Sequence, residues 1–585
     1  MLQRCAAAPA QRGDRRVRRR RTCVRVLLRW LRLCRAAVLV LCTGTQVFAD
    51  GDTTTPRRKF IELGWDIPAT ALLRESWREM EQTTPFDGVM FKVEAKDDQG
   101  GALSSESLWD GRPWKREWLE PALADLKSCA FARFTDNFVR FNATPGTLDW
   151  ADDAGWAALA DKAGHCAWLM KQSGSKGLAI DFESYGAHQF KLDAAKGRAF
   201  AETAALARRR GGQFVRGIAR EFPDAVLLAL WLNSINLKAG ASAEPDTILA
   251  SSGYGLLPAF IDGMLDAAPP AMVLVDGCEN GYYMDSAEEY LRAAHAMRSW
   301  NGDAIRLVSQ ANRPKYRQQV QAGFGFYLDM FLNDATNRYY RGPLDGSRLD
   351  RLERNLGFAR DAADEYVWVY GEQCRWWGKP LNVPNSVGKG RLWEEAMPGI
   401  TRAIACVRDP IRAAQDEIAR LRAAGALTNL ARNPDFAHPS AEETRALPAE
   451  FGAWQDETTS SGKFTWDPSV GSGAGRATGV KWGCFIQSHD VKAGDTYAVE
   501  ADGLSRGASN PTLVVRWQTK QDVDAMTLIM PSGRPERGVV FGHLRGLRES
   551  DPAGKQKPPH YDSFGVYLKS RMMTSTSWPS FGGRP

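Results

Sequence analysis

The chain has 585 residues, of which 44% are hydrophobic and 25% are charged, and its formal net charge is +7. At roughly 100–200 residues per domain, this length allows two to four domains and a large buried core. The composition is that of a globular protein, which excludes a single small module and a disordered or fibrous chain.

The positive charge belongs to the first 49 residues. They carry 12 Arg against one Asp, a net charge of +11, which leaves −4 for residues 50–585. The Arg-rich start is followed by an apolar stretch at 36–42 and a small-residue exit at 47–49, the pattern of an export signal cleaved before Asp50. We therefore expect residues 1–49 to be a signal peptide and the protein to be exported, either to the periplasm, to the cell surface or into the medium. The alternative is a basic anchor that stays attached.

Several classes of function lack their sequence signatures in the body of the chain. Its net negative charge argues against a nucleic-acid partner. It has no second stretch of about 18 apolar residues, so no stable membrane insertion is expected once the leader is removed. It has no CxxC, HExxH, GxxxxGK[ST] or GxSxG motif, so no metal and no cofactor is expected. Cys278 and Cys374 are a pair that an exported protein could join, if their loops meet.

Between residue 59 and about residue 424, short apolar runs alternate with segments of helical period, which is the pattern of repeated βα units. Eight runs are predicted to be strands: 60–66, 88–93, 137–141, 177–183, 226–231, 271–276, 323–329 and 366–370. Helices are expected at 71–81, 154–172, 194–221, 287–299 and 347–365, with a last amphipathic helix over 392–424. This predicts the α/β class, with a (β/α)8 TIM barrel over residues 50–425. A doubly wound open sheet is the alternative, but it usually has a Gly-rich first turn, and none follows Asp66.

The character of the sequence changes at 429–436. Short alternating runs at 479–487, 496–500 and 512–517 then predict a smaller all-β sandwich over 426–570. The stretch 518–559 is rich in Gly, Pro and Arg and is predicted to be irregular, and 571–585 to be a disordered tail.

Acidic residues follow six of the eight predicted strands. In a barrel the active site is built on the carboxyl ends of the strands, so these side chains are expected to converge. They are Asp66, Glu94, Asp181 with Glu183, Asp276 with Glu279, Asp329, and Glu372.

Asp181-Phe182-Glu183 is the most informative of these elements. Residues two apart on a strand share a face, so the two carboxyls are predicted to stand side by side. Like charges this close raise the pKa of one carboxyl, which then keeps a proton for donation. The alternative is an ion pair of the strand end with Lys92 or Arg140.

Paired carboxylates are the usual machinery for breaking a glycosidic bond. Glu279 and Asp329, and behind them Glu372, are the candidates for the second carboxyl. A structural or substrate-orienting role stays open for each of them, and so does a metal-dependent hydrolase, because a carboxylate cluster can also hold a divalent cation. The candidate catalytic residues are therefore Glu183, Asp181, Glu279, Asp329 and Glu372.

Aromatic and amide residues are predicted at the same rim. A sugar ring offers an apolar face of CH groups and an equator of hydroxyls, so flat rings beside acids and amides favour a carbohydrate substrate. The alternative for each aromatic residue is core packing. The candidate substrate-binding residues are Trp65, Asp66, Asn142, Tyr185, Trp231, Asn233, Asp276, Tyr282, Tyr327, Trp376 and Trp377, with Tyr283 in the same group of aromatics.

These residues carry a resemblance. The first region resembles a glycoside-hydrolase-type (β/α)8 barrel, and residues 177–183 (GLAIDFE) resemble the fourth-strand motif of chitinase-like hydrolases. The resemblance implies that Glu183 is the proton donor and Asp181 its partner. The family carries a further Asp where this chain has Ala179.

The second region is similar to jelly-roll carbohydrate-binding modules. The similarity lies in the Asn-Pro-Asp-Phe opening at 433–436, the strand at 483–487, the turn at 491–497 and the close at 561–567. Trp454, Trp466, Trp482 and Trp517 are its candidate glycan platforms, with core packing as the alternative. The sequence thus predicts an exported glycoside hydrolase that acts on poly- or oligosaccharide and carries a carbohydrate-binding domain. The alternative is a non-catalytic surface glycan-binding protein with a degenerate barrel.

Overall fold

The structure is a computed structural model. It describes residues 58–64, 67–344, 346–378, 390–426, 428–442 and 446–490, and beyond these seven strands between residues 496 and 569. The predicted signal peptide, the predicted tail and residues Trp65 and Asp66 lie outside the described residues. None of the described helices is long and apolar enough to cross a membrane.

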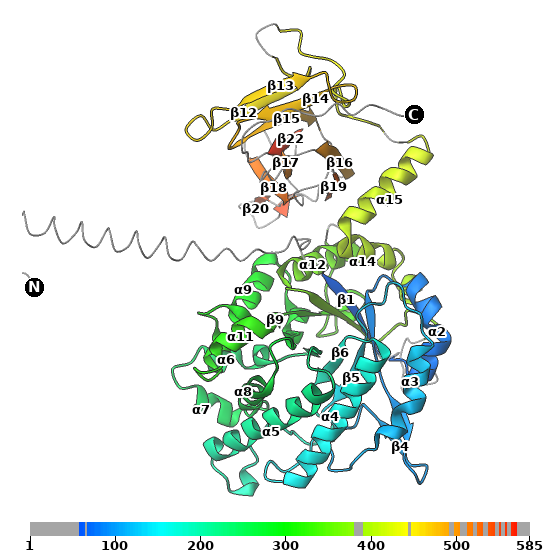
Figure 1. The fold of residues 1–585 in the computed structure, drawn as a ribbon, viewed down its shortest axis with the longest axis vertical. Helices are drawn as coiled ribbons and strands as arrows, with labels where there is room; N and C mark the ends of the chain where they lie inside the picture. The colour runs from blue at the N-terminus through cyan, green and yellow to red at the C-terminus, as the bar shows by residue number, and fades with distance from the viewer. Residues whose placement is uncertain are drawn as a thin grey trace, which may run out of the picture. The chain divides into compact units, whose positions relative to one another are not determined.

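Nine strands form one parallel sheet that is nearly closed into a barrel (Figure 1), in the order β10-β11-β1-β2-β5-β6-β7-β8-β9. All eight predicted runs contribute to it. The strands are β1 (Lys59–Gly64), β2 (Gly88–Phe91), β5 (Phe138–Asn142), β6 (Gly177–Asp181), β7 (Val226–Ala229), β8 (Val273–Asp276), β9 (Val320–Ala322), β10 (Phe324–Tyr327) and β11 (Tyr366–Gly371). The α/β class and the parallel barrel predicted from the sequence are confirmed.

Strands β9 and β10, which stand at the two ends of this order, are consecutive in the chain. β9 pairs with β8, β10 pairs with β11, and only Gly323 separates β9 from β10. The backbone N–H of Gly323 donates to the carbonyl oxygen of Asp276 at 2.8 Å. A Cβ at this residue would lie 2.8 Å from the Val275 side chain, so the close approach requires glycine. Counted together, β9 and β10 occupy one position, which gives the sheet eight positions.

Helices connect the strands, as right-handed βα units require. They are α2 (Thr70–Thr83), α3 (Glu120–Lys127), α4 (Asp153–Ser173), α5 (Phe200–Glu221), α6 (Leu237–Gly240), α7 (Pro245–Ser251), α8 (Leu257–Ala267), α9 (Ala287–Arg298), α10 (Asp303–Arg306), α11 (Arg313–Gln319) and α12 (Arg348–Ala362). A small hairpin, β3 (Glu94–Lys96) with β4 (Ala102–Ser104), follows β2.

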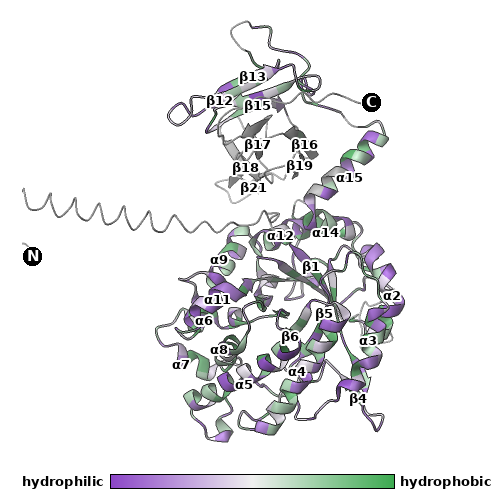
Figure 2. Ribbon diagram, viewed as in Figure 1, coloured by the Kyte–Doolittle hydropathy of each residue, from purple (hydrophilic) through white to green (hydrophobic). Residues whose placement is uncertain are grey.

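Local signals fix where the longer helices begin and end. Asp152 caps α4 by accepting a hydrogen bond from the Gly155 N–H at 2.9 Å, and Gly174 ends it in the left-handed conformation with φ of 72°. Ser286 and Ser347 cap α9 and α12 in the same way. Hydrophilic and hydrophobic segments alternate along these helices (Figure 2), so each buries one side against the sheet.

The predicted single helix over 392–424 is wrong. The chain forms three helices there: α13 (Trp393–Ala396), α14 (Ile400–Arg408) and α15 (Pro410–Ala423). Gly399 has a positive φ of 93° and separates the first two. Pro410 opens the third, because a proline has no N–H to continue α14 but fits the first turn of a new helix.

Every described element after α15 is a strand, as the sequence predicts. One antiparallel sheet has the order β12-β15-β22-β17-β18, and three further pairs are β13 with β14, β16 with β19, and β20 with β21. The bounds are β12 (Gly452–Gln455), β13 (Lys463–Asp467), β14 (Ala474–Thr478), β15 (Gly483–Asp490), β16 (Thr496–Gly503), β17 (Thr512–Gln518), β18 (Val523–Ile529), β19 (Glu536–His543), β20 (Glu549–Ser550), β21 (Gln556–Lys557) and β22 (Ser563–Lys569).

Strands β18 and β19 fall within 518–559, which the sequence analysis predicts to be irregular. β18 pairs with β17 over seven residues and β19 with β16 over eight. Polar and apolar residues alternate over only a short stretch in each strand. A prediction from composition therefore follows the surrounding Gly, Pro and Arg residues instead.

Candidate active site

Asp181 ends β6 and is bound to the neighbouring strand β5. Its Oδ2 accepts hydrogen bonds from the Arg140 guanidinium at 2.6 Å and from the Asn142 amide at 2.8 Å. Its Oδ1 accepts the backbone N–H of Glu183 at 2.9 Å. The parallel register sets Asn142 opposite Asp181, so both side chains leave the sheet at the same edge. Asp181 is 1% exposed and faces a buried cation.

The ion pair is thus made with Arg140, while Lys92 pairs with Glu94 at 2.7 Å. Arg140 also lies 3.2 Å from Glu106, a residue from the loop that follows β4. Burial raises the pKa of the Glu106 carboxyl despite this arginine. Arg140 therefore forms ion pairs with two carboxyls near the carboxyl end of β5.

Glu183 follows β6 and is partly buried. Burial first, and the negative charge of Asp181 second, raise the pKa of the Glu183 carboxyl. A hydrogen bond with Tyr185 and the positive charges of Arg140 and His188 act in the opposite direction. Glu183 therefore has neighbours that stabilise its charged form.

Glu279 follows β8, two strands along the sheet from β6. Cys278, directly before it, has a positive φ of 34°, a strained conformation for a residue with a Cβ, and this turn directs the chain into the short 3-10 helix η4 (Glu279–Tyr283). Burial, then the charges of Asp181 and Glu183, raise the pKa of the Glu279 carboxyl to about 8. The three carboxyls therefore lie within electrostatic range of one another at the rim.

Asp329 and Glu372 belong to the next part of the rim. Asp329 is fully buried and accepts the backbone N–H groups of Glu372 at 2.7 Å and Gln373 at 3.2 Å. Burial raises the pKa of Asp329 to about 7, although these two hydrogen bonds favour its charged form. Glu372 accepts the Tyr370 hydroxyl at 2.8 Å. Asp329 thus joins the ends of β10 and β11.

Two of the predicted substrate-binding residues lie behind the rim with no exposed surface. Asp276 accepts the N–H groups of Leu232 at 3.0 Å and Ser234 at 2.9 Å, together with the Ser234 hydroxyl. Asn233 donates to the carbonyl oxygen of Ala304 at 3.3 Å. Asp276 thus connects the end of β8 to the chain after β7, and Asn233 connects that chain to α10.

Aromatic rings continue from Glu279 along the rim. Tyr282 stacks with Tyr370 at 6.2 Å and lies 5.1 Å from Tyr327, and Tyr327 stacks with Tyr370 at 5.4 Å. Trp231, after β7, meets the ring of Tyr254 edge-on at 5.4 Å. Tyr185 and Tyr283 are the exposed members, at 67% and 52%. These rings and the three carboxyls occupy one side of the rim.

Trp376 and Trp377 are both buried. Trp376 packs edge-on against Phe86 at 4.9 Å. Phe86 precedes β2, at the opposite end of the strands from the acids. The structure thus places Trp376 in the core beside the foot of β2.

Tyr254 is the rim residue that the sequence analysis missed. The charges of Glu183, Asp181 and Glu279, after burial, raise the pKa of its hydroxyl, which places this side chain near all three carboxyls. It lies in a loop between α7 and α8, far from the end of any predicted strand. No spacing pattern distinguishes it in the sequence.

The sequence leaves open a metal-dependent hydrolase and a disulfide between Cys278 and Cys374. Within the part of the chain that the structure describes, no group of three or more His, Cys, Asp or Glu side chains is arranged to hold a metal ion. Cys278 and Cys374 are not joined to each other, and both are free.

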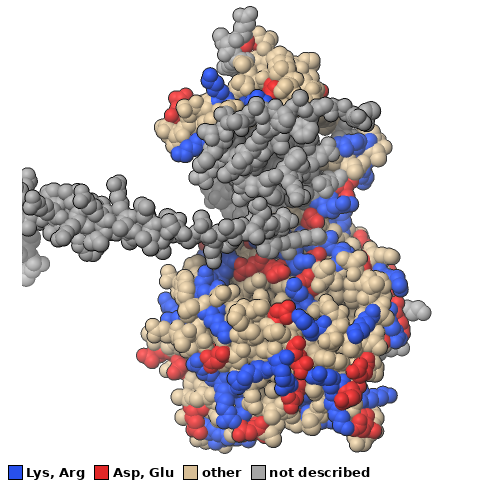
Figure 3. Space-filling view, viewed as in Figure 1, with Lys and Arg blue, Asp and Glu red and all other residues tan. Residues whose placement is uncertain are grey.

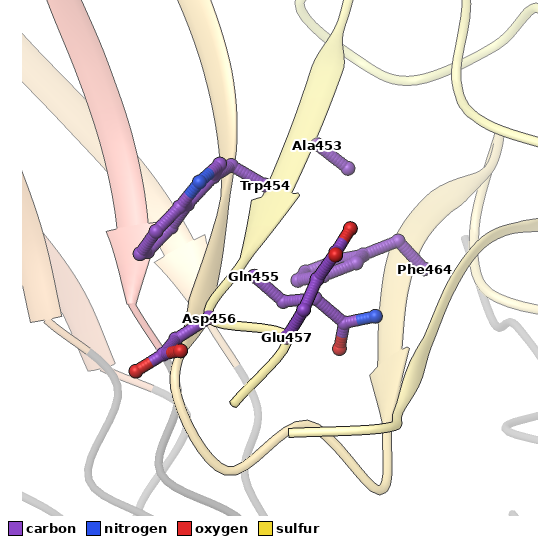
Figure 4. A pocket seen from close by; sticks show the side chains of 6 residues that line it. All are labelled: Ala453, Trp454, Gln455, Asp456, Glu457 and Phe464. Carbon is purple, nitrogen blue, oxygen red and sulfur yellow. The ribbon is translucent and has the colours of Figure 1, made fainter. Parts of the chain in front are cut away.

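The all-β region has a hollow of about 440 Å³ at β12, lined by Ala453, Trp454, Gln455, Asp456, Glu457 and Phe464 (Figure 4). Trp454 and Asp456 lie on one side of β12, and Gln455, Glu457 and Phe464 on the other (Figure 4). Trp454 is 50% exposed and pairs with Cys484 on β15. Trp482, 43% exposed, lies directly before β15.

A scan against models of protein families finds no match, and neither does a search of curated proteins. Among solved structures the chain is similar to glycoside hydrolases. A GH5-4 broad-specificity endoglucanase from Bacteroides salanitronis has 11% identity and a TM-score of 0.31, with 60% of this chain and 92% of that one covered. A GH5 xyloglucanase from Bacteroides ovatus has 14% identity and a TM-score of 0.31, with 60% and 75% covered. A family 44 endoglucanase from Clostridium thermocellum has 10% identity and a TM-score of 0.28, with 88% and 94% covered.

Proposed function

We propose that this chain is a glycoside hydrolase in which Glu279 is the general acid and Glu183 is the nucleophile or base. The observation that carries the proposal is the difference between the surroundings of two carboxyls, Glu183 after β6 and Glu279 after β8. Every influence on Glu279 favours its neutral form, and its pKa is about 8. Burial and Asp181 also raise the pKa of Glu183, but Arg140, His188 and Tyr185 act against that rise, and no such neighbours act on Glu279. Two carboxyls whose pKa values are pushed apart are suited to acid and base roles at neutral pH.

This assignment exchanges the roles that the chitinase-like resemblance implies, in which Glu183 donates the proton. Asp181 remains an accessory residue in either version. Held by Arg140 and Asn142, it orients the backbone of Glu183 and adds negative charge near Glu279.

In the proposed reaction, Glu279 gives its proton to the glycosidic oxygen as the bond to the leaving sugar breaks. Glu183 either attacks the anomeric carbon or takes a proton from the attacking water. Tyr254 and the exposed Tyr185 border the acids and offer ring faces and hydroxyls to the sugar, and the buried Trp231 supports Tyr254 from behind.

The test uses residues 50–585 with a panel of polysaccharides and of aryl glycosides whose phenol is a good leaving group. Such phenols leave without protonation, so Glu279→Gln should lose about 100-fold or more on polysaccharide and much less on the activated glycosides. Glu183→Gln should lose activity on both. Glu288→Gln, on the outer surface of α9, is the matched control.

The opposite pattern, with Glu183→Gln rescued by the good leaving group, would restore the roles given by the resemblance. No turnover of any substrate by the parent protein, with glycan binding retained, would favour the non-catalytic binding protein. Loss of turnover in the presence of a chelator would favour the metal-dependent hydrolase.

We also propose that residues 1–49 direct export and that the all-β region binds glycan through Trp454 and Trp482. Two half-exposed indoles, one on β12 and one directly before β15, support the second proposal, because a flat exposed ring is what a sugar ring stacks on.

A further inference from the structure

The loop after β10 brings positive charge to the rim beside Glu279. It contains the sequence Arg338-Tyr339-Tyr340-Arg341. The Arg338 guanidinium lies 4.3 Å from the centre of the Tyr339 ring. Tyr339 stacks on the exposed Tyr283 at 6.0 Å and meets Tyr327 edge-on at 5.6 Å. The loop is therefore continuous with the row of rings that begins beside Glu279.

Neither Arg338 nor Arg341 has an acidic partner among the described residues. Arg338 donates to the Tyr339 hydroxyl, and Arg341 donates to the backbone carbonyl oxygen of Tyr283. Both contacts leave the guanidinium charge without a counter-charge. By contrast, Arg351 and Arg354, further along the chain, both pair with Asp285.

Asp334, four residues before Arg338 in the same loop, accepts hydrogen bonds from Thr336 and is paired with neither arginine among the described residues. Three acids of the rim also do little to neutralise the loop. Glu279 holds its proton in the neutral range, since its pKa is about 8. Asp329 is fully buried, and its two oxygens are bound to backbone N–H groups. Asp181 is paired with Arg140. The electrostatic neighbours of Tyr283 include both Arg338 and Glu279, so this exposed ring lies near both the cation and the proposed acid.

We propose that Tyr283, Tyr339, Arg338 and Arg341 form a subsite for an anionic sugar unit, so that the substrate of the proposed hydrolase is an acidic polysaccharide. The exposed tyrosine ring would take the apolar face of the sugar. The two guanidiniums would take its anionic group, because their planar N–H pairs match a carboxylate or a sulfate ester in geometry and charge. This inference rests on the proposed function for its catalytic consequence. The binding of an anionic sugar can be measured without turnover.

The experiment measures binding and turnover by residues 50–585 on matched pairs of polymers. Polygalacturonate, alginate and hyaluronan are compared with their carboxyl-reduced forms, and dextran sulfate with dextran. We expect the charged member of one pair to bind at least 10-fold more tightly than its neutral partner. Carboxyl reduction and desulfation distinguish a uronic acid from a sulfate ester.

Variants locate the effect. Arg338→Gln with Arg341→Gln should remove the preference for the charged polymer and flatten the salt dependence of binding, whereas Arg338→Lys should keep part of both. Arg78→Gln is the matched control, because the exposed Arg78 lies 4.4 Å above Trp77 on α2 and likewise has no acidic partner. Its preference and its salt dependence should equal those of the parent.

The outcomes separate the two proposals. If the parent binds neutral and charged polymers equally and cleaves them at equal rates, the anionic subsite is overturned and the hydrolase proposal stands. If it binds them equally and cleaves neither, both proposals fail. If the parent binds charged polymer through Arg338 and Arg341 but cleaves none, the subsite stands and the hydrolase proposal fails. A charge preference that survives in the double variant places the anion elsewhere and overturns the subsite.

Discussion

Glu279 is a carboxyl that the folded chain holds protonated at neutral pH, and this affects stability as well as chemistry. An unfolded glutamate ionises near pH 4.3. Between that value and about 8 the folded state binds a proton that the unfolded state has released. The free energy of unfolding therefore falls as the pH rises through this window, and the loss is complete above pH 8.

Glu279→Gln should remove this loss, because glutamine has no charged form to bury. We expect the variant to match the parent at pH 4.5 and to exceed it by about 1–3 kcal/mol at pH 8.5. Urea unfolding at the two pH values measures the difference. Glu288→Gln, exposed on α9, should show none. Parallel pH profiles for the parent and Glu279→Gln would show that the Glu279 pKa is not raised.

The sequence predicts that Asp181 and Glu183 share a face of one strand, but β6 ends at Asp181 and Glu183 follows it, so strand alternation does not set the direction of Glu183. The sequence leaves two cations, Lys92 and Arg140, as partners for this pair. Only the register of β5 against β6 decides between them, since it brings Arg140 within 2.6 Å of Asp181. Tyr254 could not be predicted, because its loop reaches the rim through the packing of α7 and α8 and through no periodic pattern.

At the scale of elements, helices α5 and α8 approach closely through glycine. A Cβ at Gly263 would lie 1.8 Å from the carbonyl oxygen of Arg208, and one at Gly211 would lie 1.9 Å from that of Phe260. These backbones touch because neither glycine has a side chain, and so the helices have no room to add a methyl group.

Gly263→Ala should therefore lower the free energy of unfolding by about 1–3 kcal/mol, because the helices must move apart. Gly357→Ala in α12 is the matched substitution, since a Cβ there would meet nothing within 4 Å. It should leave stability unchanged or raise it by up to about 1 kcal/mol, as alanine is the better helix former. Equal effects of the two substitutions in thermal or urea unfolding would contradict this account of the α5–α8 contact.

The strands were predictable as elements because each is a short apolar run bounded by turn residues. The division of the last helical segment into α13, α14 and α15 was harder to predict. Its apolar period continues across Gly399 and Pro410, and a proline at the first turn of a helix is compatible with that period. The prediction that 518–559 is irregular missed β18 and β19 for a related reason. It followed the Gly, Pro and Arg content of the stretch, and the two alternating runs are short.

At the scale of the whole molecule, the strands of the barrel and those of the all-β region belong to separate sheets. Lysines and arginines are interspersed with acids over the face of the barrel in Figure 3, which agrees with the absence of a single-sign body charge in the sequence. Steering by one large field is not expected of such a face.

The proposed division of labour between catalysis and tethering gives a prediction at this scale. Trp454→Ala with Trp482→Ala should weaken retention on the polysaccharide that the protein cleaves by about 10-fold or more, with turnover of short soluble glycosides unchanged. Trp300→Ala removes an equally exposed indole, 58% exposed, from the barrel and is the control. Retention that is unaffected in the double variant, measured by affinity electrophoresis, would exclude these two indoles as the glycan site.

The carboxylates of Asp181, Asp276 and Asp329 have a consequence for how this protein can diversify. Each accepts backbone N–H groups at the rim: those of Glu183, of Leu232 and Ser234, and of Glu372 and Gln373. These bonds depend on main-chain atoms, so they survive changes in the side chains of the loops above. The loops can therefore change in sequence while these bonds keep the backbone at the ends of the strands in place.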